Sequence, residues 1–161
     1  MIYDLVFGES HVGGRMGKKL VEMVRPLRGK AKKLPKSERW NFVKRLCDEG
    51  GLQFFFAPFA TCNPLQASKM RCHNESDTPI WIRKTPNVET REPGLCIGCA
   101  CAILDKSHEA FWQSRFLEYS LAAKDSEGFS GDKREQFRAI TFRADQARQV
   151  LRVIGANLEN D

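Results

Sequence analysis

The sequence of 161 residues lacks any apolar run near the roughly 20 residues needed to cross a bilayer. Its first residues, Met1-Ile2-Tyr3-Asp4, also lack the basic segment and apolar stretch of a secretory leader. No paired-carboxylate, phosphate-loop or nucleophile-elbow motif is present. These absences predict a soluble, cytoplasmic protein with reduced thiols, and they give no support for an enzyme.

Cysteine, by contrast, is well represented, with six residues in the chain. Cys96 and Cys99 are two residues apart, a spacing that lets two thiolates reach one zinc ion, and Gly98 between them is expected to take a positive φ. Cys62 and Cys72 lie upstream on a longer loop, which other structure must close. The sequence therefore predicts a structural Zn²⁺ site with the ligands Cys62, Cys72, Cys96 and Cys99, closed by four protein ligands and without an open position for substrate.

Other interpretations of these residues stay open. Cys101, His73 or His108 can replace one of the four proposed ligands. The thiols can also be ordinary core residues, or form disulfides, for which six cysteines allow fifteen pairings. Cys47 follows Leu46 near the end of a predicted helix and has no partner spacing, so we interpret it as a core cysteine.

Positive charge is concentrated at the N-terminal end. Residues 1–47 carry 12 Lys and Arg against 4 Asp and Glu, whereas the rest of the chain is close to neutral. Such asymmetry indicates a polyanionic partner, with nucleic acid as the first candidate and anionic lipid as the second. The predicted nucleic-acid-binding residues are Arg15, Lys18, Lys19, Arg25, Arg28, Lys30, Lys32, Lys33 and Lys36.

Hydrophobic periodicity predicts a mainly α fold with a minor β component. Residues 2–7 are expected to form a strand or an extended arm, residues 15–27 a basic amphipathic helix disturbed by Pro26, and residues 28–36 a loop. Ser37 is predicted to cap a helix to about residue 48, with Trp40, Val43 and Leu46 facing inward. Residues 52–57 and 80–82 are expected to be short strands.

The C-terminal part is predicted to be an antiparallel pair of helices, from about residue 105 to 124 and from 132 to 158. The second helix starts with the capping-box pattern Asp132-x-x-Glu135. Apolar residues then recur every three or four positions, at Phe137, Ile140, Ala144, Ala147, Leu151, Ile154 and Leu158. The expected units are a basic helical segment (1–51), a zinc-ribbon-like segment with short strands (52–104) and a helical hairpin (105–161).

The residues from Phe59 onward resemble the C-terminal tail of certain large tyrosine-recombinase integrases and transposases of mobile elements. The resemblance rests on Phe59-Ala-Thr-Cys62-x-Pro64, Cys72, Leu95-Cys96-x-x-Cys99, the helix with Trp112 and Arg115, and the terminal helical seam. It implies a zinc-bound appendage that binds DNA, or helps to assemble a DNA-bound complex, in integration or recombination. The family's His-x-x-Arg segment ahead of a nucleophilic tyrosine is not found, because His11 and Arg15 are spaced differently and Tyr3 precedes them.

The leading hypothesis is a zinc-stabilised DNA-binding protein, and the resemblance suggests an accessory or tail module of a mobile-element integrase or recombinase. One alternative is a protein-protein interaction module, such as a regulator or inhibitor, that contains a structural zinc site and meets an acidic partner. The other is a fragment of a DNA recombinase or nuclease, for which Tyr3, His11 and Arg15 are the sole candidates for a site. No catalytic residues are assigned.

Overall fold

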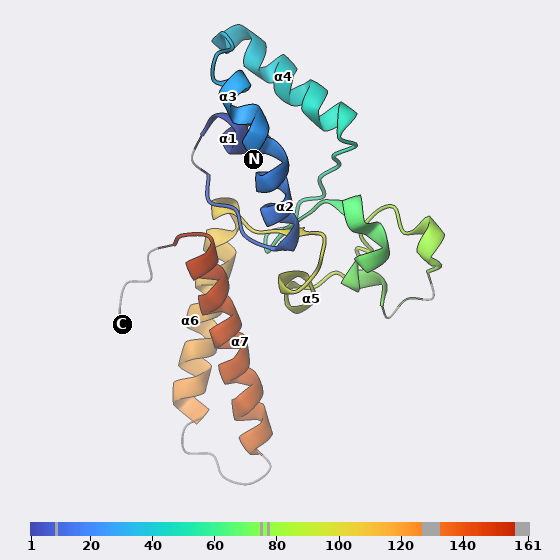
Figure 1. Cartoon of the computed structure of the whole chain (residues 1–161). Helices are drawn as coiled ribbons and strands as arrows, with labels where there is room; N and C mark the ends of the chain where they lie inside the picture. Colours follow the sequence, from blue (N-terminus) through green and yellow to red (C-terminus); the bar gives the residue numbers. More distant parts are fainter. Residues whose placement is uncertain (9, 75, 77, 127–132, 157–161) are drawn as a thin grey trace. The chain divides into compact units, whose positions relative to one another are not determined.

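The computed structural model describes residues 1–8, 10–74, 76, 78–126 and 133–156 (Figure 1). It divides into two compact units, Met1–Asp105 and Lys106–Asp161. The boundary coincides with the predicted start of the helical hairpin, whereas the proposed division at residue 51 falls inside the first unit. Within the described residues the fold is mainly α, with one small two-stranded sheet, as the sequence predicts. No helix in this part of the chain has the length and apolar character required to span a membrane.

The first unit begins with a group of helices, drawn in blue to teal in Figure 1. These are α1 (Ile2–Phe7), α2 (Arg15–Val24), the 3₁₀ turn η1 (Arg25–Leu27), α3 (Arg28–Ala31) and α4 (Lys36–Glu49). The predicted basic helix is confirmed, and Pro26 lies in the 3₁₀ turn that follows the end of α2 at Val24. Proline lacks the amide hydrogen that an α-helix would need there.

Two predictions for this group are wrong. Residues 2–7 form a helix and not a strand, because Ile2, Leu5 and Val6 share one face that is buried against the other helices. The predicted loop 28–36 begins with α3, where Ala31 is fully buried and the Arg28 Nε donates a hydrogen bond of 2.9 Å to the Leu5 carbonyl. Helical structure thus continues to Ala31, further along the chain than the polar composition of residues 28–36 predicts.

Helix α4 matches its predicted range, but one of its side chains points the other way. Pro35, and not Ser37, is the residue at the N-cap position. Val43 is buried and Leu46 and Cys47 pack at the edge of the core, as expected, whereas Trp40 is 67% exposed. The predicted inward orientation of Trp40 is therefore wrong, since Val43 takes the core-facing position and Trp40 lies at the margin.

The sheet joins segments that are far apart in the sequence. Strand β1 (Thr61–Cys62) pairs antiparallel with β2 (Ala102–Ile103), with Cys62 opposite Ala102. Residue Phe55 forms a single bridge to Cys62, which is all that the predicted strand 52–57 contributes. On the other side, Gly13 exchanges backbone hydrogen bonds with Leu104. These bonds attach the segment just before α2 to the residue just after β2.

The remaining elements of the first unit are short turns and one short helix: η2 (Pro64–Lys69), η3 (Arg71–His73), η4 (Ile80–Ile82) and α5 (Pro93–Ile97). The predicted strand at 80–82 is wrong, because the amides of Ile82 and Arg83 bond back to the carbonyls of Pro79 and Ile80 and close a 3₁₀ turn. A three-residue segment without a neighbouring strand has no ladder to join, so these local bonds prevail.

The first unit contains two clusters of buried side chains. The helical core is aliphatic and is formed by Ile2, Leu5, Val6, Met16, Leu20, Val24, Ala31, Val43, Leu52 and Ile103. The cysteine cluster is smaller and is formed by Cys62, Met70, Cys72, Cys99, Cys101 and Ala102. Sheet residues Ala102 and Ile103 belong to different clusters, so β2 separates the two.

The second unit contains the turn η5 (Lys106–His108) and the helices α6 (Glu109–Ser126) and α7 (Lys133–Val153), which pack against each other as an antiparallel pair (Figure 1). This confirms the predicted hairpin. The seam of α7 and the turn after it is buried at Ala144, Ala147, Val150, Leu151 and Ile154. Asp132 of the predicted capping box and Leu158 at the end of the seam lie outside the described residues.

Candidate metal centre

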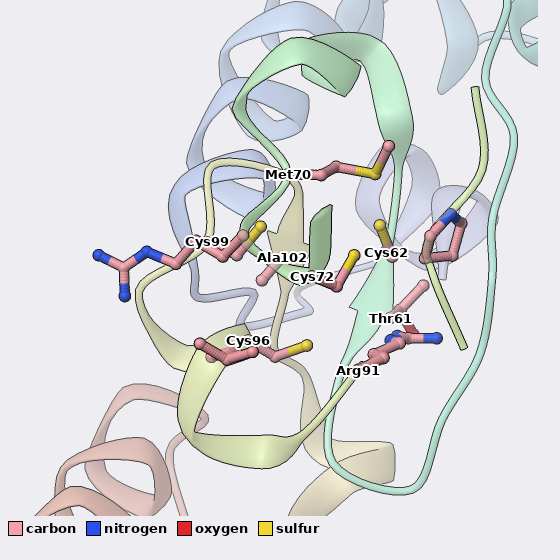
Figure 2. Close-up of a pocket in the computed structure, with 11 residues that line it drawn as sticks. Thr61, Cys62, Met70, Cys72, Arg91, Cys96, Cys99 and Ala102 are labelled. Carbon is pink, nitrogen blue, oxygen red and sulfur yellow. The ribbon is translucent and has the colours of Figure 1, made fainter. Parts of the chain in front are cut away.

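The four cysteines predicted as zinc ligands line one cavity in the first unit (Figure 2). Cys62 comes from β1, Cys72 from η3, Cys96 from α5, and Cys99 follows α5. All four are buried, with exposed fractions of 6–8%. The cavity has a free volume of about 10 Å³, which is close to what a single water molecule needs. A site of this size is suited to a single ion.

Backbone pairing explains how residues so distant in the sequence meet. The β1–β2 ladder places Cys62 beside the segment that follows Cys99, and the Asn63 amide donates to the Cys101 carbonyl at 2.9 Å. Helix α5 packs against η3, which brings Cys96 to the side of Cys72. Other structure thus brings Cys62 and Cys72 to one cavity, as the sequence hypothesis requires.

Backbone amides point at two of the sulfurs. The Asn87 amide donates to Cys72 Sγ at 3.3 Å. The backbone N–H groups of Arg71 and Cys101 both hydrogen-bond to the sulfur of Cys99. Both sulfurs thus lie within reach of backbone donors.

Three thiols of this region have raised pKa values. A hydrogen bond with Cys101, reinforced by burial, raises the pKa of Cys99, and a hydrogen bond with Cys62 raises the pKa of Cys101 to about 11. Burial raises the pKa of Cys96. Within the described ranges, no group of three or more His, Cys, Asp or Glu side chains is in an arrangement that could hold a metal ion. Metal binding therefore requires loss of these protons and rotation of the thiols toward a common centre.

The donor set is of the kind that soft metals prefer. Four sulfur donors in a small, largely apolar cavity are typical of structural zinc and of iron-sulfur centres, whereas magnesium and calcium prefer oxygen. A tetrathiolate zinc centre would carry two negative charges, and Arg91 lines the same cavity. The cavity thus brings together four thiols and one guanidinium.

The three alternative ligands lie in different surroundings. Cys101 is closest to the four, since its thiol hydrogen-bonds with Cys62 and Cys99, and its Sγ donates to the Gln66 carbonyl at 3.2 Å. His73 is buried, and its Nε2 bonds to the Thr85 carbonyl at 2.8 Å; since a carbonyl only accepts, Nε2 carries the proton. His108 is buried in the second unit. Neither Cys101 nor His73 lines the cavity.

Arg91 is a residue of this site that sequence reasoning missed. One of its terminal nitrogens donates to the carbonyls of Phe55 (3.2 Å) and Ala60 (2.7 Å), and its guanidinium lies over the Phe59 ring at 5.5 Å. The side chain also hydrogen-bonds to the Cys96 thiol. Arg91 therefore ties the segment before β1 to the second half of the cysteine site. An isolated arginine has no spacing signal from which this role could be read.

The glycine of the knuckle has a different role from the predicted one. Gly98 has a φ of −97°, so the expected positive φ is wrong. A Cβ at this position would overlap the guanidinium of Arg71, which lies against the glycine backbone. Gly98 is thus suited to a close approach by a side chain and not to a left-handed turn.

Most of the predicted nucleic-acid-binding residues are exposed. Arg28 is the exception, because it is half-buried and its Nε holds the Leu5 carbonyl. The remaining eight form no ion pair within the part of the chain that the structure describes. On α2, the spacing of Arg15, Lys18 and Lys19 places them on one face, opposite the buried Met16 and Leu20. The other exposed cations are Arg25, Lys30, Lys32, Lys33 and Lys36.

Comparison with protein-family models, with curated proteins and with solved structures finds no match. The resemblance to the tail of tyrosine-recombinase integrases therefore remains a prediction. The three candidates for a catalytic site lie in different surroundings. Tyr3 is half-buried and contacts the rings of Phe7 and Trp40, whereas His11 and Arg15 are exposed.

Proposed function

We propose that this protein binds DNA through the exposed cations of residues 15–36, and that a structural zinc ion held by Cys62, Cys72, Cys96 and Cys99 stabilises the unit that presents them. The observation that carries the proposal is the set of eight exposed cations without ion-pair partners in the described residues. Such cations release counterions when they meet phosphates, which makes association favourable and dependent on salt.

Zinc is expected to contribute through the architecture of the first unit and not through chemistry on a substrate. The cysteines of the cavity connect β1, η3 and α5, and β2 attaches the same region to the start of α2 through Gly13 and Leu104. A zinc ion with four thiolates would fix these segments in the way that structural zinc does in small domains. We assign no catalytic residue, and we propose that the protein acts in the cytoplasm as an accessory or tail module of a mobile-element recombinase.

Charge reversal tests the DNA-binding proposal. The variant Lys30→Glu/Lys32→Glu/Lys33→Glu/Lys36→Glu is expected to bind a mixed-sequence duplex far more weakly. The slope of log K against log salt should also fall by about 3–4, because each phosphate contact in B-DNA contributes about 0.9. A mobility-shift titration over a range of salt concentrations measures both quantities.

The second unit offers a control with the same change in net charge. Lys124, Arg134, Arg138 and Arg152 are exposed on α6 and α7, outside the proposed surface. Reversing these four residues should leave the salt slope unchanged. Equal losses in the two variants would show that only net charge matters, and an unchanged affinity after reversal of the four lysines would refute the proposed surface.

A protein-interaction module is the second candidate function, and exposed apolar side chains favour it. Ile80, Trp81, Ile82 and Val88 are all more than half exposed, and three of them are consecutive. Exposed apolar patches of this kind mark sites of protein contact. Capture of a partner that survives nuclease treatment, together with absence of DNA binding, would favour this function over the first.

A further inference from the structure

Trp40 stands out in the basic part of the molecule, because this large apolar side chain is 67% exposed. It lies on α4, and Lys36 and Lys44, both exposed, are one helical turn before and one turn after it. The indole is therefore bracketed by cations along the helix. A solvent-exposed tryptophan between lysines differs from the predicted core residue and calls for an explanation of its own.

The Trp40 ring is supported from below by other aromatic rings. It stacks on Tyr3 with a centroid distance of 4.7 Å and an interplanar angle of 26°. Tyr3 in turn packs on Phe7 at 4.9 Å, and Phe7 meets Phe42 edge-on at 6.3 Å. This aromatic ladder, composed of Phe42, Phe7, Tyr3 and Trp40, runs from the margin of the helical core to solvent. Tyr3 covers one face of the indole, so the exposed surface of Trp40 consists of the other face and the ring edges.

A planar ring held in this way is preorganised to extend the ladder by one more ring. Stacking on it would cost little entropy, because Tyr3 already restricts the indole. Phosphates beside the stacked ring would be met by Lys36 and Lys44. A ligand with a flat aromatic group attached to an anionic backbone matches both features, and an unpaired nucleotide is such a ligand. Bases inside a duplex are stacked on one another and do not offer a free face.

We propose that Trp40 is a stacking platform for an unpaired base, so that the basic surface prefers single-stranded DNA over duplex. The inference rests on the proposed DNA-binding function and adds the strand preference and the residue that determines it. Cationic grooves combined with aromatic platforms are the usual means by which proteins bind single strands, and alanine substitution of a platform weakens binding about 5- to 150-fold.

The test compares two exposed tryptophans. Trp40→Ala is expected to weaken binding of fluorescein-labelled dT20 by about tenfold, with no change in affinity for a mixed-sequence duplex. Its salt slope on dT20 should equal that of the wild type, since the substitution removes no cation. Trp81→Ala is the matched control, because Trp81 is 80% exposed on η4, away from the basic segment in the sequence, and its removal should change neither affinity.

Conservative replacement guards against an effect on folding. Trp40→Phe retains a ring that can stack, so it should recover most of the dT20 affinity, and circular dichroism should show wild-type helix content in all variants. Unchanged dT20 binding by Trp40→Ala, alongside lost binding in the four-lysine reversal, would overturn the platform and leave the proposed DNA-binding surface standing. Equal weakening on dT20 and duplex would also overturn it. Absence of DNA binding by the wild-type protein would overturn both proposals.

Discussion

The two buried clusters of the first unit differ in what holds them together. The helical core contains ten buried aliphatic or small side chains from four helices and the adjoining segments. Each Å² of apolar surface that these side chains bury contributes about 25 cal/mol to stability, and such burial stabilises packed helices. The cysteine cluster contains four thiols, one methionine and one alanine, on two-residue strands and single turns. It buries far less hydrocarbon for each residue that must be ordered.

Small regions that bury little apolar surface usually depend on metals or disulfides. All six cysteines of the chain are free thiols, and four of them face one cavity. From this contrast we predict that the helical core is stable on its own and that the cysteine region needs the proposed zinc ion. Each prediction below tests one side of this contrast.

The largest effect is expected from removal of a zinc ligand. Cys62→Ser, Cys72→Ser, Cys96→Ser or Cys99→Ser should abolish stoichiometric zinc and expose residues 52–104 to proteolysis, because structural zinc contributes about 10–16 kcal/mol of binding free energy in zinc-finger peptides. Metal analysis of the purified protein and limited proteolysis measure the two results.

Cys47 provides the matched control for these variants. It is half-buried against the helical core, and burial raises the pKa of its thiol. Cys47→Ser should retain one zinc per chain. Cys101→Ser should retain it as well if the four predicted ligands are the correct set, and loss of zinc in that variant would assign Cys101 as a ligand. A wild-type protein without zinc would end the metal hypothesis.

A smaller effect is expected in the helical core. Leu20 is fully buried on α2, so Leu20→Ala should lower the free energy of unfolding by about 2–5 kcal/mol. Zinc stoichiometry should stay at one, since the substitution lies in the other cluster. Urea denaturation followed by helix signal, with metal analysis of the folded variant, checks both statements. If zinc were lost when Leu20→Ala destabilises the helical core, the two clusters would form one cooperative unit.

The elements that the sequence predicted well are those with long, regular periodicity. Helices α2, α4 and α7 repeat their apolar residues every three or four positions, and local spacing determines such a pattern. The location of the four cysteines around one cavity was also predictable, because the metal-ligand hypothesis requires them to lie close together. It does not say which backbone contacts bring them there. The antiparallel pairing of Cys62 with Ala102 could not be predicted, since a contact across forty residues leaves no local signal.

The wrong predictions share a physical cause. The type of a side chain does not by itself determine which residues will pack beside it in the fold. Residues 80–82 have strong β propensity, yet they form a turn, and among the described residues neither β1 nor β2 pairs with them. Trp40 was expected in the core because it is large and apolar, but Tyr3 offers it a stacking partner at the surface. Residues 2–7 were too few to show helical periodicity clearly.

The smallest effects concern two glycines whose roles the structure distinguishes. Gly14 has φ 80° and ψ 163°, and a Cβ there would strike the Ala102 backbone carbonyl. This conformation is nearly exclusive to glycine and costs other residues about 1–3 kcal/mol, so Gly14→Ala should loosen the attachment of α2 to β2 and lower stability by about that amount. Thermal or urea denaturation measures the loss.

Gly98→Ala should be much milder, although Gly98 belongs to the cysteine knuckle. Its φ of −97° is open to any residue, and the overlapping atoms are the far end of the exposed Arg71 side chain, which can swing away. Zinc stoichiometry and stability should stay near wild-type values. A loss of zinc on Gly98→Ala would show that the Arg71 guanidinium must lie against the knuckle. The cysteine region would then depend on that contact as well as on an ion.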